Sequence, residues 1–69
     1  MMSNQVLIKL KSVMQKTGLS RSSVYNKLDP KSPYYDPEFP RQVKLGRVSV
    51  AWVESEVDTW IDSIIENRK

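Results

Sequence analysis

The chain has 69 residues, of which 39% are hydrophobic and 28% charged, so it fits one small globular domain and is too apolar for disorder. It has no cysteine and no histidine, which excludes disulfide bonds, Cys/His zinc sites, cysteine nucleophiles and histidine general bases, and with them most hydrolytic and metal chemistry. The net charge of +3 is unevenly placed, because residues 1–47 include nine basic and three acidic residues, whereas residues 48–69 include two basic and five acidic ones. The basic part favours nucleic acid as partner, since lysine and arginine attract phosphates and release their counterions.

The start of the chain and the length of its apolar runs indicate the cellular location of the protein. The start, residues 1–5, lacks the basic and then apolar build of a signal peptide, and no apolar run is long enough to span a membrane. We therefore expect a cytoplasmic protein with no membrane contact, no cofactor and no metal.

The first predicted element is a short amphipathic helix over residues 10–17. Leu10, Val13, Met14 and Thr17 follow the i, i+3, i+4, i+7 spacing of one helical face. Gly18 stands where a left-handed residue would end this helix.

A second helix over residues 20–28 follows at once, with Ser20 as its N-cap. So tight a connection makes the two helices cross steeply. Val24 and Leu28 can pack against the first helix, which leaves a small polar face centred on Ser22 and Asn26. Such a face can enter a groove and form hydrogen bonds with base edges.

Residues 29–40 contain all four prolines and cannot sustain a helix or a central strand. We expect an ordered loop, because three aromatic residues in this stretch are more than a free linker carries. Tyr34, Tyr35 and Phe39 are predicted to hold it to the core.

The next two segments, residues 42–45 and 48–52, are β-branched and partly alternating. Gly46-Arg47 between them predicts a hairpin with a two-residue turn. Val43 and Leu45 share one face of its first strand, and Lys44 points to the other.

The last segment is predicted to be an amphipathic helix. Ser55 and Asp58 match the pattern of a capping box, while Arg68 and Lys69 suit the negative end of the helix dipole, and Glu54 and Glu56 suit the positive end. The apolar stripe at helical spacing consists of Val53, Val57, Trp60, Ile61, Ile64 and Ile65.

The order of these elements predicts a fold that is mainly α with a small β-hairpin. Helix, tight turn, polar-faced helix, loop, basic hairpin and closing helix form a winged helix-turn-helix, that is, three helices plus a wing. We expect a single DNA-binding domain over residues 1–69, with an ordered core from about residue 7 to residue 65.

Several blocks of the sequence also resemble the AlpA family of phage regulators. The most specific block runs from Thr17 to Tyr25, Thr-Gly-Leu-Ser-Arg-Ser-Ser-Val-Tyr, and the others lie at residues 7–11, 39–40, 43–46 and 52–61. The resemblance implies a small prophage-borne DNA-binding protein within the wider group of excisionase and MerR-like winged helices. The chain departs from the family between Leu28 and Phe39, where members have a shorter connection.

The resemblance and the predicted faces give one set of candidate DNA-binding residues. The family places the recognition helix in the major groove, and the wing on flanking phosphates or in the minor groove. Candidates on the recognition helix are Ser20, Arg21, Ser22, Ser23, Tyr25, Asn26 and Lys27, and candidates on the wing and for the DNA backbone are Arg41, Lys44 and Arg47.

Each of these features has a plainer interpretation. The helix face could be merely solvated, Tyr25 could pack against the loop, and any single cation of the wing is as often solvated as bound. Trp52 and Trp60 fit the core better than a stacking platform for single strands. The acidic residues of the last helix suit its dipole better than a metal or acid-base site.

We expect the protein to bind double-stranded DNA sequence-specifically, not to be an enzyme, and to act as an AlpA-like regulator of an integrase gene. An excisionase that binds and bends recombination-arm DNA would use the same surface, and integrase or RNA polymerase would be the protein partner. A protein-interaction module such as an anti-repressor is more remote, and RNA binding more remote still. A single small winged domain offers a modest interface, so we expect a monomer in solution and several copies on adjacent sites.

Overall fold

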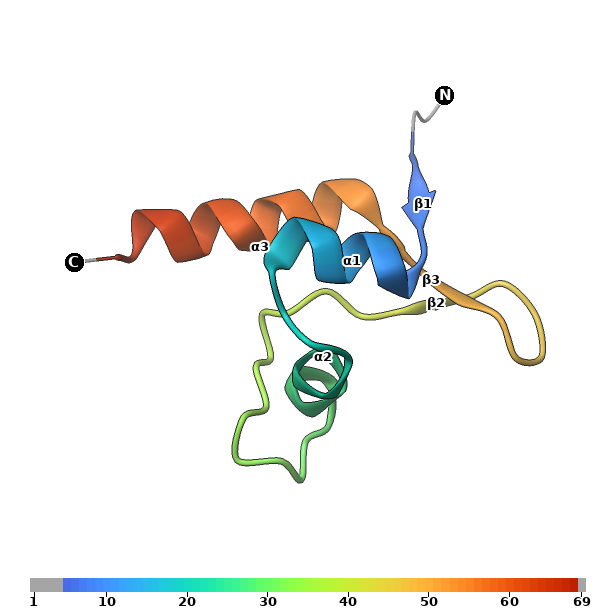
Figure 1. Ribbon diagram of the computed structural model, residues 1–69, viewed down its shortest axis with the longest axis horizontal. Coiled ribbons are helices and arrows are strands. Elements are labelled where there is room, and N and C mark those ends of the chain that lie inside the picture. The colour runs from blue at the N-terminus through green and yellow to red at the C-terminus, as the bar shows by residue number, and fades with distance from the viewer. Residues whose placement is uncertain (1–4, 69) are drawn as a thin grey trace.

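A computed structural model describes residues 5–68, so the expectations about residues 1–4 and about Lys69 lie outside the described residues. Within it the elements follow in the order β1 (Leu7–Ile8), α1 (Leu10–Thr17), α2 (Arg21–Leu28), β2 (Val43–Lys44), β3 (Val50–Val53) and α3 (Glu54–Glu66). The mainly helical fold with a hairpin wing is the predicted one (Figure 1).

The strands form one small antiparallel sheet in the order β1-β3-β2. Leu7 pairs with Val53 and Ile8 with Trp52 on one side of β3, and Val43 pairs with Ala51 on the other. β1 was not predicted, because a strand of two residues is too short to show a period and owes its existence to the distant β3. The pairing makes β3 the central strand of the sheet.

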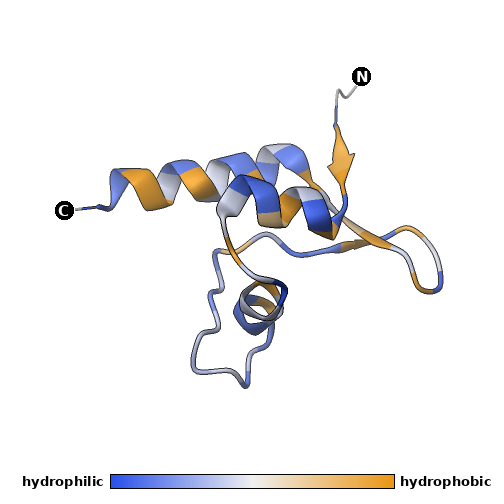
Figure 2. Cartoon of the chain, viewed as in Figure 1, coloured by the Kyte–Doolittle hydropathy of each residue, from blue (hydrophilic) through white to orange (hydrophobic). Residues whose placement is uncertain are grey.

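The hydrophobic core draws on all three helices, β3 and the end of the proline-rich segment. Its buried members are Val13, Val24, Phe39, Trp52, Val57 and Trp60. Trp52 is fully buried and Trp60 is 8% exposed, so the prediction that both belong to the core is confirmed. In Figure 2 hydrophobic and hydrophilic residues alternate along α1 and α3, as expected of helices with one apolar face.

The turn between α1 and α2 has the predicted chemistry. Gly18 adopts the left-handed conformation at a φ of 76°, and its N–H donates to the carbonyl of Met14. Ser20 then caps α2 by accepting a hydrogen bond of 3.1 Å from the N–H of Ser23. The short turn makes the helices cross steeply, as the end-on view of α2 beside α1 shows (Figure 1).

The proline-rich segment, residues 29–40, is an ordered loop as predicted, because successive side chains close its turns. Asp29 accepts from the N–H of Lys31, Ser32 from Tyr34 and Asp36 from Glu38. Phe39 is buried as expected.

The prediction that Tyr34 also packs on the core is wrong. Its side chain is 68% exposed, because the turn closed by the Tyr35 N–H and the Ser32 carbonyl directs its central residues outward.

The hairpin also differs from the prediction in its turn. The register of Lys44 with Val50, continued by the hydrogen bond from the Leu45 N–H to the Ser49 carbonyl, leaves three residues in the loop instead of two. β3 therefore begins at Val50, and Val48 lies in the loop with 90% of its surface exposed. The backbone pairing of β2 with β3, and not the local turn signal, therefore determines the length of this loop.

The predicted capping box of the last helix is wrong as well. α3 begins at Glu54, directly after β3, so Ser55 lies inside its first turn. Val53 occupies the N-cap position, and among the described residues its side chain forms no capping hydrogen bond. The pairing of β3 with β1 fixes this start, because the N–H of Glu54 donates to the carbonyl of Val6 at 2.8 Å. The acidic residues Glu54 and Glu56 do lie in the first turn, as expected from the helix dipole.

An ion-pair cluster joins α1 to the start of α3. The ammonium group of Lys16 lies 2.9 Å from a carboxylate oxygen of Asp58 and 3.2 Å from one of Glu54. Hydrogen bonds to Asp58 and Glu54 raise the pKa of Lys16 above its ordinary value. Lys16 therefore neutralises part of the negative charge at the start of α3.

Removing the N-cap of α2 should destabilise the protein. We expect Ser20→Ala to lower the free energy of unfolding by about 1 kcal/mol, because the N–H of Ser23 loses its partner. Denaturant titration followed by circular dichroism would measure this. Ser22→Ala, an exposed change in the first turn of the same helix, should cost less than about 0.5 kcal/mol; equal losses in the two variants would contradict the cap.

The Lys16 cluster should make stability depend on alkaline pH. Because the pKa of Lys16 is higher in the folded than in the unfolded chain, its contribution is complete below the ordinary value of 10.5 and disappears as pH rises through the folded value. Lys16→Gln should therefore melt at a lower temperature than the wild type at neutral pH, and the difference should vanish at strongly alkaline pH. Lys11→Gln, on the exposed face of the same helix, is the matched control.

Candidate nucleic-acid interface

The exposed side of α2 carries the candidate base-reading residues. Val24 is fully buried and anchors the helix, while Arg21, Ser22 and Tyr25 are exposed and Asn26 is half-buried. Tyr25, with 38% of its surface exposed, is thus available on this side. The arrangement leaves short polar side chains and one guanidinium group on a helix narrow enough for a major groove.

Ser20 and Ser23 have a structural role in addition to any contact with a ligand. The hydroxyl of Ser20 accepts from the N–H of Ser23 and donates to the Ser23 hydroxyl at 3.0 Å. Both hydroxyls therefore hold the amino-terminal turn of α2, which supports Arg21 and Ser22.

Lys27 differs from the other candidates on α2. Its ammonium group lies 5.6 Å from the ring centroid of Trp60, a cation–π distance, so the side chain turns toward the proline-rich segment and α3. The contact depends on Trp60, which is distant in sequence, and helical periodicity alone does not reveal it. Lys27 thus borders the face centred on Ser22 and Asn26 and is not part of its centre.

The hairpin supplies a second group of cations. Lys44 is exposed on β2, Arg47 is exposed in the loop beside Val48, and Arg41 is exposed just before β2. The hairpin loop and the carboxyl end of α3 project toward opposite ends of the long axis of the molecule (Figure 1). The hairpin loop with Arg47 therefore lies away from the carboxyl end of α3, whereas the acidic first turn of α3, with Glu54 and Glu56, directly follows β3.

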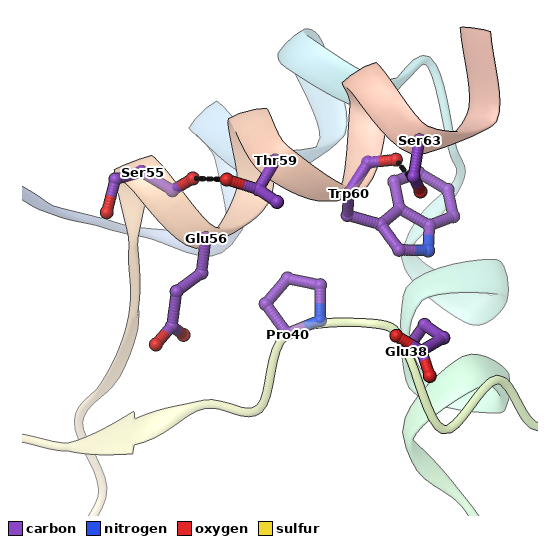
Figure 3. A pocket seen from close by; sticks show the side chains of 7 residues that line it. All are labelled: Glu38, Pro40, Ser55, Glu56, Thr59, Trp60 and Ser63. Carbon is purple, nitrogen blue, oxygen red and sulfur yellow. Dashed lines mark hydrogen bonds between the residues drawn. The ribbon is translucent and has the colours of Figure 1, made fainter. Parts of the chain in front are cut away.

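Two surface depressions flank the proline-rich segment. One, of about 330 Å³, lies against α3 and contains the carboxylates of Glu38 and Glu56, the ring of Pro40 and the edge of Trp60 (Figure 3). Its lining is acidic and hydroxylic, which disfavours a phosphate ligand.

The other depression, of about 300 Å³, lies against the carboxyl end of α2 and includes Lys27 and Arg41. Sequence reasoning missed Tyr35 and Gln42 as neighbours of these two cations in this depression. The run of prolines gave a signal for a loop but none for the side of the molecule on which the loop lies.

Metal and membrane features can be assessed for residues 5–68. No group of three or more potential metal-ligating side chains comes together within this range. None of the helices in the same range combines the length and the apolar character that a membrane crossing requires.

Comparisons with known proteins agree with the resemblance seen in the sequence. The family model described as "Prophage CP4-57 regulatory protein (AlpA)" matches residues 6–65. The chain is 47% identical over 55 residues to the DNA-binding transcriptional activator AlpA of Escherichia coli strain K12, covering 80% of this chain and 79% of that protein. It is 40% identical over 62 residues to the uncharacterized protein ORF88 of Enterobacteria phage P4, covering 90% of this chain and 64% of that protein.

No solved structure matches the chain at a significant level. The family model spans both the α1–α2 pair and the hairpin with α3, so the match includes every element described above. The chain therefore belongs to the AlpA family of prophage regulatory proteins.

Proposed function

We propose that this protein is a sequence-specific double-stranded DNA-binding regulator. The observation that carries the proposal is the exposed side of α2, where Arg21, Ser22 and Tyr25 face solvent while Val24 anchors the helix in the core. The 47% identity to a protein named as a DNA-binding transcriptional activator supports it. This function requires no catalytic group.

In the proposed complex α2 lies in the major groove. Arg21 and Asn26 have the donors and acceptors that distinguish guanine and adenine edges, and Ser22 is short enough to let the helix approach. Lys44 and Arg47 of the hairpin contact the neighbouring phosphates, and Arg47 beside Val48 can reach into the minor groove. The sites on α2 then specify sequence, while the hairpin fixes orientation.

The regulatory role we propose is control of an integrase gene, in the cytoplasm where the DNA lies. The alternative is an excisionase that occupies recombination-arm DNA with integrase. A specific observation favours a protein contact in either role: Ile64 and Ile65 at the end of α3 are 50% and 47% exposed. We propose a free monomer and several copies on adjacent sites, because one small domain provides little interface for specificity.

Charge reversal on either DNA-facing element should strongly weaken duplex binding. We expect Arg21→Glu and Lys44→Glu each to reduce affinity for a labelled duplex by roughly tenfold or more, because each change replaces an attraction to phosphate or base with a repulsion. Fluorescence anisotropy measures the affinity, and circular dichroism checks folding. Arg68→Glu, an exposed change beyond α3, is the matched control and should bind as the wild type does. Normal binding by both variants would contradict the proposal and favour a protein partner.

The wild-type affinity should fall steeply with salt. If about five phosphates are neutralised, the slope of log K against log salt should be about −4 to −5. The same anisotropy assay, repeated between about 50 and 200 mM salt, gives this slope, and a slope near zero would be incompatible with phosphate contacts of this number.

The location of the binding sites should separate the two regulatory roles. Fragmented DNA from the source genome, retained by the purified protein and sequenced, should be enriched in a short repeated motif. A motif beside the promoter of an integrase gene would support the regulator, and tandem motifs on a recombination arm would support the excisionase. Absence of any enrichment by a folded protein would overturn specific DNA binding.

A further inference from the structure

The depression between α2 and the proline-rich segment has the chemistry of an anion site with an apolar wall. It has a volume of about 300 Å³, and its lining includes the cations Lys27 and Arg41, the amide of Gln42 and the rings of Tyr35 and Phe39. These groups suit a ligand that combines a negative charge with an apolar part.

The one carboxylate in the lining is already used by the protein. One oxygen of Asp36 accepts from the Trp60 indole N–H at 3.0 Å, and the other accepts from the N–H of Glu38 at 2.9 Å. Lys27 and Arg41 form no ion pair among the described residues. The two cations therefore outnumber the single carboxylate, and that carboxylate is occupied by N–H donors.

The walls of this depression are held in place without a ligand. The N–H of Asp36 donates to the carbonyl of Lys27 at 3.0 Å, which ties the segment directly to the last turn of α2. Phe39 packs edge-to-face on Trp60 with ring centroids 5.0 Å apart. Binding would thus require little ordering of the chain, which favours affinity.

The position of Lys27 on α2 indicates which part of a DNA duplex this depression meets. A helix about 10–12 Å across nearly fills a major groove about 12 Å wide, so residues beside its reading face point at the sugar–phosphate chains that border the groove. Lys27 follows Asn26, and one residue along a helix is about 100° around its axis. The depression therefore flanks the reading face at the height of a groove wall.

We propose that this depression receives one sugar–phosphate unit of the DNA strand that borders the major groove. Arg41 and Lys27 pair with the phosphate, Gln42 donates to it, and Tyr35 packs on the deoxyribose. The proposal rests on the proposed DNA-binding function and gives residues 29–40 a role in it, since this segment forms the outer wall of the depression. The segment is then a second backbone-contacting element besides the hairpin.

The test compares salt dependence in single variants of the full chain with a labelled duplex of about 20 base pairs that carries the motif recovered from the genome. Arg41→Gln should lose one phosphate contact, which makes the slope of log K against log salt less steep by about 0.9. The ratio of wild-type to variant affinity should therefore fall about 3.5-fold between about 50 and 200 mM salt. Arg68→Gln removes the same charge from an exposed position outside the depression and should leave the slope unchanged.

A second measurement tests the pocket and not merely the charge. Uncharged methylphosphonates, placed one at a time along the same motif, should weaken wild-type binding at the phosphate held by the depression. The same substitution should have no further effect on Arg41→Gln, and Tyr35→Ala should reduce the wild-type effect at that position while folding normally.

The outcomes separate this proposal from the proposed function. Arg41→Gln could show the same slope of log K against log salt as the wild type, while Arg21→Glu and Lys44→Glu lose binding. This result would overturn the proposal that the depression binds DNA and would leave the DNA-binding function intact. An equal change of slope in Arg68→Gln would also overturn it, because the effect would then be one of total charge. Normal binding by Arg21→Glu and Lys44→Glu would instead remove the function on which the proposal rests.

Discussion

The indole of Trp60 makes the contacts that hold α2, the proline-rich segment and α3 together. Its N–H donates to Asp36, its ring meets Phe39 edge-to-face, and the ammonium group of Lys27 lies over it. One side chain of α3 thus touches both the proline-rich segment and the last turn of α2. In a chain of 69 residues the core is small, so a single aromatic that joins three elements has a large share of the packing. The orientation of α2 relative to the wing follows from this contact and from the Gly18 turn.

The local signals of the sequence were sufficient for the helix-turn-helix. Gly18 and Ser20 determine where α1 ends and α2 begins through their own backbone and side-chain chemistry, and the apolar spacing around Val13 and Val24 gives the buried faces. For the same reason helical spacing correctly places Arg21, Ser22 and Tyr25 on the exposed side of α2. These features depend on neighbours within a few residues, and a single sequence carries them.

What could not be predicted depends on contacts between distant residues. β1 exists because Leu7 finds Val53, and the start of α3 is fixed by the carbonyl of Val6 instead of the Ser55 and Asp58 pattern. The hairpin loop has three residues because Lys44 pairs with Val50 and the Leu45 N–H donates to the Ser49 carbonyl, a pairing that the Gly46-Arg47 pattern does not reveal. The candidate site likewise includes features that depend on distant residues. Lys27 points toward Trp60, and Tyr35 and Arg41 line the same depression, because of the way the proline-rich segment folds.

The direct passage from β3 into α3 has a mechanical consequence. Val53 ends the strand and Glu54 begins the helix, with the first N–H of the helix bonded back to the residue before β1, so no flexible residue separates the two elements. The hairpin and α3 consequently follow one another without a linker, with Arg47 in the hairpin loop and the exposed Ile64 and Ile65 near the carboxyl end of α3. Because no loop lies between them, a change in the direction of β3 would change the direction of α3 as well.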